Sequence, residues 1–250
     1  MSLANRGFFL YGRVAVSYLL SVVAVIIFFT PVLILAACLP QRLRSHNKLL
    51  FWFLNCAYKA VLKSTFVPIT IKGKEHLPHD GAAIVVANHE SALDIPILGS
   101  LMSGQPHVWY VLARFASTPV LGFFVRRMGI PVEQSCSMKS ARALLQGIRC
   151  MQKKSMHALL FPEGGRYNDG KIHDFFLGFA ILAQKTGRPV VPVMLRNPGK
   201  VLPPKGLIVY WHPIYVTIGE AFVLQESETV ELFSHRVHRW FDEQNRIGLH

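Results

Sequence analysis

The stretch AAIVVANHESALD, residues 82–94, decides the fold. Its first six residues are all apolar, which is typical of a short buried strand. His89 and Asp94 follow, five positions apart. Five residues on a regular helix are separated by about 140° of rotation. The two side chains therefore meet only if His89 lies in the loop after the strand and the first turn of the next helix returns Asp94 toward it.

Beyond residue 65, short strands and helices alternate along the chain. Apolar runs predict strands at residues 67–71, 82–87, 108–113, 130–132, 158–161, 190–195 and 207–211. Helices are predicted at residues 91–102, 119–128, 138–153, 175–185 and 229–245, with a loop at residues 199–206. This alternation is typical of an α/β fold. We expect a mostly parallel central sheet flanked by helices, with ligands beyond the carboxyl ends of its strands.

An apolar segment without charges, residues 14–39, precedes this domain. It is long enough to cross a bilayer as a helix, but Pro31 is expected to kink or break it. Basic residues flank both ends, so the positive-inside rule gives no orientation. Two arrangements stay open: a tilted spanning helix, or a segment bent near Pro31 that keeps both ends on the cytoplasmic face.

Residues 47–63 form a second apolar stretch whose lysines are able to reach lipid headgroups. We expect a two-helix membrane anchor over residues 1–64, dug into one leaflet, and a catalytic domain over residues 65–250 on the cytoplasmic face. The tetrapeptide LAAC at residues 35–38 supports an alternative, a cleaved lipoprotein signal. The apolar region is longer than the usual core of a signal peptide, which disfavours export.

The charge distribution favours a membrane partner. The formal net charge is +13, and residues 1–74 contain no Asp or Glu. A basic and apolar segment is typical of proteins that bind an anionic phospholipid surface. Nucleic acid is the other common partner of basic proteins. The sequence contains no nucleic-acid-binding motif, so we do not expect the protein to bind nucleic acid. The four cysteines form no CxxC pair, so we expect no metal site.

The pair of His89 and Asp94 carries the first chemical prediction. A neutral imidazole accepts a proton from a hydroxyl, and a carboxylate on its other nitrogen fixes the tautomer. No serine or cysteine nucleophile signature accompanies the pair, so the base is expected to activate a hydroxyl of the substrate itself. The competing interpretation is a purely structural hydrogen bond between the two side chains.

A second motif, FPEGGR at residues 161–166, follows another apolar run. Gly164 and Gly165 permit close approach of the backbone to a ligand, and Arg166 is suited to grip a phosphate. Glu163 is expected to aim Arg166 or to bind a substrate hydroxyl. A tight turn with a surface ion pair is the alternative. Two further arginines follow the 108–113 strand and are candidate substrate contacts: Arg114 and Arg126.

In this order, the motifs resemble the four blocks of the glycerophospholipid acyltransferase family, best known for 1-acylglycerol-3-phosphate acyltransferases. The first block, N-H-x4-D, matches residues 88–94, and the third, F-P-E-G-T-R-S, matches residues 161–166 except at Gly165. The second block, P-x-x-G followed by G-x-I-P-V-D-R, is similar to residues 119–134. The fourth, a V-P-V strand, resembles residues 191–193. The resemblance runs from about residue 67 to residue 211.

The resemblance implies transfer of a fatty acyl group from acyl-CoA or acyl carrier protein to a glycerol hydroxyl, without metal or other cofactor. His89 carries over as general base, Asp94 as its orienting partner, and Glu163 and Arg166 as contacts to the acceptor's glycerol phosphate. Cationic contacts of the family are missing at Gln134 and Phe176. The resemblance implies lysophosphatidic acid as the acceptor. The missing cations support two alternatives: another lyso-lipid as acceptor, or a non-catalytic lipid-binding module of the same fold.

Overall fold

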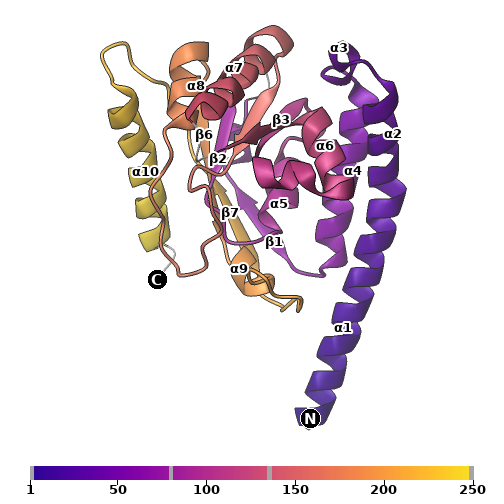
Figure 1. The fold of residues 1–250 in the computed structure, drawn as a ribbon. Coiled ribbons are helices and arrows are strands. Elements are labelled where there is room, and N and C mark those ends of the chain that lie inside the picture. Colours follow the sequence, from indigo (N-terminus) through magenta and orange to yellow (C-terminus); the bar gives the residue numbers. More distant parts are fainter. Residues whose placement is uncertain (1–2, 79–80, 134–136, 248–250) are drawn as a thin grey trace.

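The computed structural model describes residues 3–78, 81–133 and 137–247. Its centre is a seven-stranded sheet in the order β1-β7-β6-β2-β5-β3-β4 (Figure 1). Neighbouring strands are parallel except β6 and β7, which are antiparallel. The predicted α/β fold with a mostly parallel sheet is confirmed. The strands are β1 (Ile69–Lys72), β2 (Ile84–Ala87), β3 (His107–Leu112), β4 (Gly129–Val132), β5 (His157–Leu160), β6 (Val190–Arg196) and β7 (Ile214–Ile218).

The middle strand β2 is fully buried because helices cover both of its faces. Val85 and Ala87 point to a core that includes α5, while Ile84 and Val86 point to one that includes α7, α8 and α10. The main helices of the domain are α5 (Asp94–Leu101), α6 (Pro119–Met128), α7 (Ser137–Lys154), α8 (Gly178–Thr186) and α10 (Val230–Ile247). Figure 1 shows α7, α8 and α10 on one side of the sheet and α5 on the other.

The strand expected at residues 207–211 is wrong. That segment is a loop, and the strand β7 begins only at Ile214. The loop leaves Leu207 and Trp211 exposed, whereas β7 has alternating burial with three buried side chains. The prediction relied on the apolar composition of residues 207–211, which does not by itself distinguish a buried strand from an exposed loop. The loop expected at residues 199–206 overlaps a short helix, α9 (Pro198–Val201).

The apolar N-terminal segment is helical throughout, in α1 (Leu3–Ala24), a π-helical turn η1 (Val25–Phe29) and α2 (Thr30–Cys38). Pro31 does not break it, contrary to one expectation. The π turn, which is wider than an α-helical turn, ends two residues before Pro31. In a regular α-helix a proline lacks the N–H for one backbone hydrogen bond, and its ring crowds the preceding turn. Residues Tyr11–Cys38 are long and apolar enough to cross a membrane, and 17% of the most apolar window is buried.

The chain reverses after α2, through α3 (Gln41–Arg44), and not at Pro31, so the predicted bend near Pro31 is wrong. The helix α4 (Lys48–Ser64) then runs back beside α1, where the Ser21 and Ser64 hydroxyls are 2.5 Å apart. Its other side packs on α5, and Leu50, Phe51 and Leu54 are buried. The second predicted helix therefore exists, but it is partly a core helix. Its share in a two-helix membrane anchor stays a prediction, as does the boundary at residue 64.

Candidate active site

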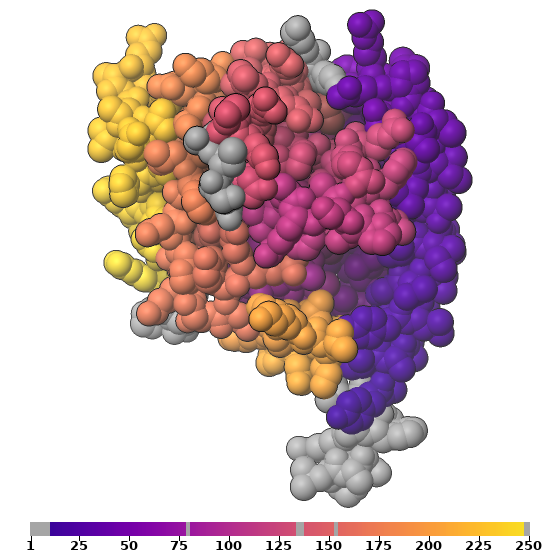
Figure 2. Space-filling model, in the orientation of Figure 1, coloured from indigo at the N-terminus to yellow at the C-terminus, as the bar shows by residue number. Residues whose placement is uncertain are grey.

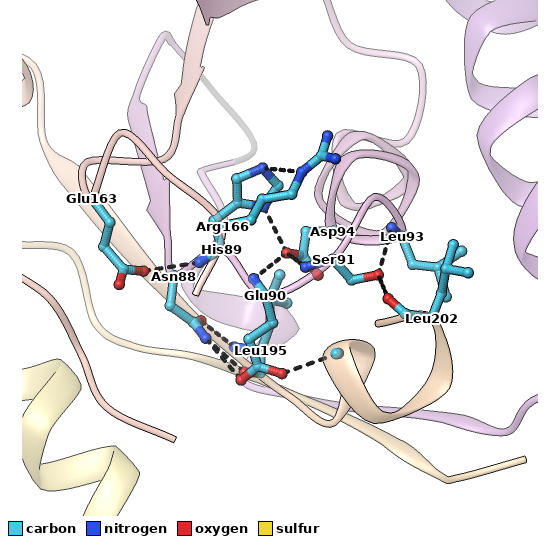
Figure 3. Close-up of polar contacts among 11 residues, drawn as sticks. Asn88, His89, Glu90, Ser91, Leu93, Asp94, Glu163, Arg166, Leu195 and Leu202 are labelled. Atoms are coloured by element: carbon cyan, nitrogen blue, oxygen red, sulfur yellow. Dashed lines mark hydrogen bonds and ion pairs between the residues drawn. The ribbon is translucent and has the colours of Figure 1, made fainter. Parts of the chain in front are cut away.

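The loop after β2 is fastened to the neighbouring strand β6 by one side chain. Asn88 Nδ2 donates to the carbonyl of Leu195 at 2.8 Å, and the Leu195 N–H donates to Asn88 Oδ1 at 2.7 Å (Figure 3). Asn88 is buried and extends the pairing of β2 and β6 by the equivalent of one residue. The loop is thereby fixed at the carboxyl end of the sheet, where open α/β folds bind ligands.

His89 and Asp94 are in direct contact. His89 Nδ1 lies 2.7 Å from Asp94 Oδ2, and Asp94 is the first residue of α5. The same oxygen accepts the N–H groups of Glu90 at 2.6 Å and Ser91 at 2.7 Å. The first turn thus folds the carboxylate back onto the loop, the geometry that the spacing required. Asp94 is fully buried, so its negative charge acts on the imidazole with little screening by water.

Two aromatic rings fix the plane of the imidazole. The His89 ring stacks on Phe161, with centroids 3.9 Å apart and planes inclined by 6°. Phe161 in turn lies against Trp109 of β3, at 5.8 Å. His89 Nε2 faces away from Asp94 and accepts a hydrogen bond from Arg166 Nε at 3.1 Å (Figure 3). The first and third motifs therefore converge, with the free nitrogen of the imidazole beside a guanidinium.

Glu163 is buried and holds two loops together. Its Oε1 accepts the backbone N–H of His89 at 2.9 Å, and its Oε2 accepts that of His173 at 3.1 Å. Burial raises the pKa of this carboxyl above its usual range, against the opposing effect of the two N–H donors. The described hydrogen bonds of Glu163 go to backbone and not to Arg166. A role for Glu163 in aiming Arg166 or binding the acceptor stays a prediction.

Glu90 is a site residue that sequence analysis missed. Its Oε2 accepts the N–H of Gly199 in α9 at 3.2 Å, and its Oε1 lies 3.4 Å from Asn88 Nδ2. Burial, reinforced by repulsion from Asp94, raises the pKa of Glu90 to about 7. The only signal in the sequence was its place beside His89. Nothing there indicates that α9, more than 100 residues later, covers it.

Glycine is favoured at positions 164 and 165 of the third motif for two different structural reasons. Gly164 has a φ of 67°, which favours glycine. At Gly165 an added Cβ would lie 2.9 Å from the Tyr167 ring. The threonine that the resembling family has at this position would therefore compete with Tyr167 for space. Tyr167 is itself fixed to the loop, because its N–H donates to the carbonyl of His89 at 2.9 Å.

The remaining predicted contacts lie on other elements. Arg114 follows β3 and lies over the Phe115 ring, and Arg126 of α6 donates to the Ala116 carbonyl. Among the described residues, neither arginine contacts His89, so their role in substrate binding stays a prediction. Gln134 falls outside the described residues. Within residues 3–78, 81–133 and 137–247, no group of three or more metal-binding side chains occurs.

Comparison with known proteins identifies the family to which this part of the chain is similar. A family model described as Acyltransferase matches residues 68–196. A chloroplastic 1-acyl-sn-glycerol-3-phosphate acyltransferase of Brassica napus is 37% identical over 141 residues, which are 55% of this chain and 40% of the relative. The corresponding Arabidopsis thaliana protein is 33% identical over 167 residues, 66% of this chain and 44% of that protein. This chain therefore spans less than half the length of these two relatives.

A solved structure shares the fold. The crystal structure of the 1-acyl-sn-glycerophosphate acyltransferase PlsC from Thermotoga maritima aligns with a TM-score of 0.78 and 21% sequence identity. The alignment covers 96% of this chain and 97% of the other. At this identity the likeness establishes the fold alone, and the chemistry has to be argued from the site.

Proposed function

Because the chain belongs to the acyltransferase family, whose model matches residues 68–196, we propose that it transfers a fatty acyl group to lysophosphatidic acid and so forms phosphatidic acid. The observation that carries the proposal is the arrangement around His89. One ring nitrogen is held by a buried carboxylate, and the other faces the exposed Arg166. The names of the relatives from Brassica napus and Arabidopsis thaliana support the same acceptor.

In the proposed reaction His89 acts as the general base. With its Nδ1 proton directed at Asp94, His89 Nε2 removes the proton from the free hydroxyl of the acceptor. The oxygen attacks the thioester carbonyl, a C–O bond forms, and the C–S bond breaks. The imidazolium returns the proton to the departing thiolate. Asp94 stabilises the transient imidazolium and holds the ring in the correct tautomer.

Arg166 is proposed to bind the phosphate of the acceptor. In the structure its guanidinium donates a hydrogen bond to His89 Nε2, the atom that is proposed to accept the proton of the acceptor hydroxyl. Arg166 is exposed, so it is able to rotate away from the ring. A phosphate that draws the guanidinium toward itself frees the base at the moment when the acceptor arrives.

The donor and the location are part of the same proposal. The acyl donor is acyl-CoA or acyl carrier protein, and no metal or other cofactor takes part. The apolar helix Tyr11–Cys38 anchors the protein to an anionic phospholipid membrane, with the catalytic domain on the cytoplasmic face. An interfacial site explains the anchor, because the amphiphilic acceptor then reaches the enzyme without crossing water.

One observation supports a second candidate for the acceptor lipid. The Tyr167 ring lies where a side chain at position 165 would project, next to Arg166 in the sequence. A lyso-lipid with a different headgroup is therefore the second candidate, with the same chemistry at His89.

The test is an acyl-transfer assay on purified protein. It offers lysophosphatidic acid, lysophosphatidylcholine and lysophosphatidylglycerol with acyl-CoA or acyl carrier protein, and measures the products by mass spectrometry. We expect phosphatidic acid as the main product, loss of all transfer in His89→Ala, and full activity in His235→Ala, which changes an exposed histidine on α10. Transfer by His89→Ala at the wild-type rate would remove the base assignment. If the wild type transfers to none of the acceptors, the fold is a lipid-binding module instead.

A further inference from the structure

A loop beside the site exposes large apolar side chains while its backbone is firmly held. This loop, residues 202–213, connects α9 to β7. The exposed fractions are 77% for Leu207, 39% for Tyr210 and 58% for Trp211. Val209 between them is buried in the core, and the Tyr210 N–H donates to the Val201 carbonyl at 2.8 Å. Single exposed apolar residues are ordinary on protein surfaces, but three within five residues of an ordered loop form a patch.

The same loop is bonded to the apolar N-terminal helix. The Tyr18 hydroxyl donates to the Leu207 carbonyl at 2.7 Å. The Arg13 guanidinium donates to the carbonyls of Val209 and Thr65, and the residue after Thr65 is Phe66, which is 49% exposed. Figure 2 shows the loop, in orange, beside the indigo helix. The exposed loop is therefore continuous with the apolar surface of the proposed anchor.

The position of Arg13 sets the level of the loop relative to a membrane. Arg13 is the last charged residue before the uncharged residues 14–39. A basic residue at the start of an apolar helix lies at the height of the lipid headgroups. Since the loop accepts hydrogen bonds from Arg13 and Tyr18, it lies at this height too. Tyrosine and tryptophan are enriched at that boundary.

The loop also touches the loop that carries the base. The Ser91 hydroxyl donates to the Leu202 carbonyl at 2.7 Å, and Gly199 donates to Glu90 at 3.2 Å. Lys205 of the loop and Lys200 of the adjoining helix α9 give this surface its positive charge, and no Asp or Glu occurs between Asp174 and Glu220. The surface is thus apolar, basic and adjacent to His89, a combination that complements an anionic bilayer.

From these contacts we infer that residues 207–211 form a second membrane contact, immersed in the headgroup layer of an anionic phospholipid bilayer beside the active site. The inference rests on the proposed function and makes it more specific. The apolar helix attaches the protein to the bilayer, and this loop brings the mouth of the site down to the lipid surface. A lyso-lipid acceptor then passes from the bilayer to His89 along the loop.

The first test is independent of activity. The full-length protein and its Trp211→Phe variant are reconstituted in vesicles of phosphatidylcholine and phosphatidylglycerol, with and without brominated acyl chains. The difference between the two emission spectra isolates Trp211. We expect this difference emission to be quenched by the brominated lipid and protected from aqueous iodide. Quenching by iodide and not by the brominated lipid overturns the inference, whether or not the protein transfers acyl groups.

The second test compares two forms of the acceptor. The double variant Leu207→Ser/Trp211→Ser is assayed with a lyso-lipid embedded in vesicles and with a short-chain lyso-lipid dissolved as monomers. Withdrawing two apolar side chains from the lipid is expected to raise the apparent KM for the embedded acceptor about tenfold or more and to leave that for the monomeric acceptor unchanged.

The matched control is Val223→Ser/Leu232→Ser. These side chains are 59% and 60% exposed; Val223 lies between β7 and α10, and Leu232 lies on α10. Figure 1 shows α10 on the side of the sheet away from α1. We expect the control to behave as the wild type with both acceptors. An equal KM for the embedded acceptor in the loop variant and the wild type refutes the loop's role. Absence of transfer by the wild type itself, with Trp211 still quenched by lipid, refutes the proposed function and not the membrane contact.

Discussion

Replacing Glu90 by glutamine tests whether ionisation of the enclosed Glu90 carboxyl destabilises the folded protein. Glu90 is largely enclosed between the His89 loop and α9, and its carboxyl accepts the Gly199 N–H at 3.2 Å. Burial, with repulsion from Asp94 as the next cause, raises its pKa from 4.5 to about 7. Glutamine has the same shape and retains an oxygen for Gly199, but it never ionises. The substitution removes the charge, and it also places the glutamine amide nitrogen beside Asn88 Nδ2 in place of the acceptor Oε1. The second change is the same at every pH, so the dependence on pH isolates the effect of the charge.

The pKa shift fixes the sign and size of the effect. Between pH 4.5 and pH 7 the carboxyl of Glu90 ionises in the unfolded chain while it stays protonated in the folded protein. The folded state then binds more protons, so the free energy of unfolding falls as the pH rises. The loss is about 1.4 kcal/mol per pH unit, or about 3 kcal/mol over the whole interval. Glu90→Gln lacks this loss, so its free energy of unfolding relative to the wild type is expected to rise by about 3 kcal/mol between pH 4 and pH 8.

The assay is urea unfolding of the detergent-solubilised protein, followed by circular dichroism at pH 4, 5, 6, 7 and 8. The quantity compared is the difference in free energy of unfolding between variant and wild type. Other raised carboxyls, such as Glu163, contribute to both proteins and largely cancel in the difference. Glu226→Gln, which changes an exposed side chain, is the control and should show no trend. A difference that is the same at pH 4 and pH 8 would show that Glu90 ionises freely in the folded protein.

The remaining predictions concern the base, the phosphate contact and the clamp to β6. Asp94→Asn keeps an acceptor for His89 Nδ1 but loses the charge that stabilises the imidazolium, so kcat should fall by about 10²- to 10⁴-fold; a wild-type kcat would make the contact purely structural. Arg166→Ala should raise KM for the lyso-lipid by about 10- to 100-fold, and Arg166→Lys should recover part of this; unchanged acceptor saturation would argue against phosphate binding. Asn88→Ala leaves both backbone groups of Leu195 unpaired and should lower the free energy of unfolding by about 2–4 kcal/mol, as measured by urea; a loss well below 1 kcal/mol would show that the clamp is dispensable.

Most strands and helices could be predicted from the sequence because buried segments are rich in apolar residues. The run at residues 82–87 had to be a strand buried by helices on both sides, and the structure has β2 at Ile84–Ala87 with no exposed side chain. Residues 207–211 are as apolar as a buried strand, yet they form a loop in which Leu207, Tyr210 and Trp211 are exposed. Composition reports the preference of a segment for apolar surroundings and does not say whether protein or lipid provides them.

Pro31 shows the same limit for the backbone. The residue is unfavourable in a regular helix, and the sequence therefore predicted a kink or a break. The structure continues as a helix, with the π turn Val25–Phe29 ending two residues before Pro31. Such a turn depends on how the helix packs against α4 as well as on its own residues, so local propensity alone did not reveal it.

At the site, the sequence by itself determined the spacing of His89 and Asp94 and the identity of Arg166, because each belongs to a short motif whose chemistry depends on residues close together in the chain. Only the tertiary structure decided what surrounds them: Phe161 stacked on the imidazole, and Glu90 enclosed beneath α9. These contacts join residues from separate strands and helices. Burial and electrostatic energy depend on distance in space, which the order of residues along the chain does not specify.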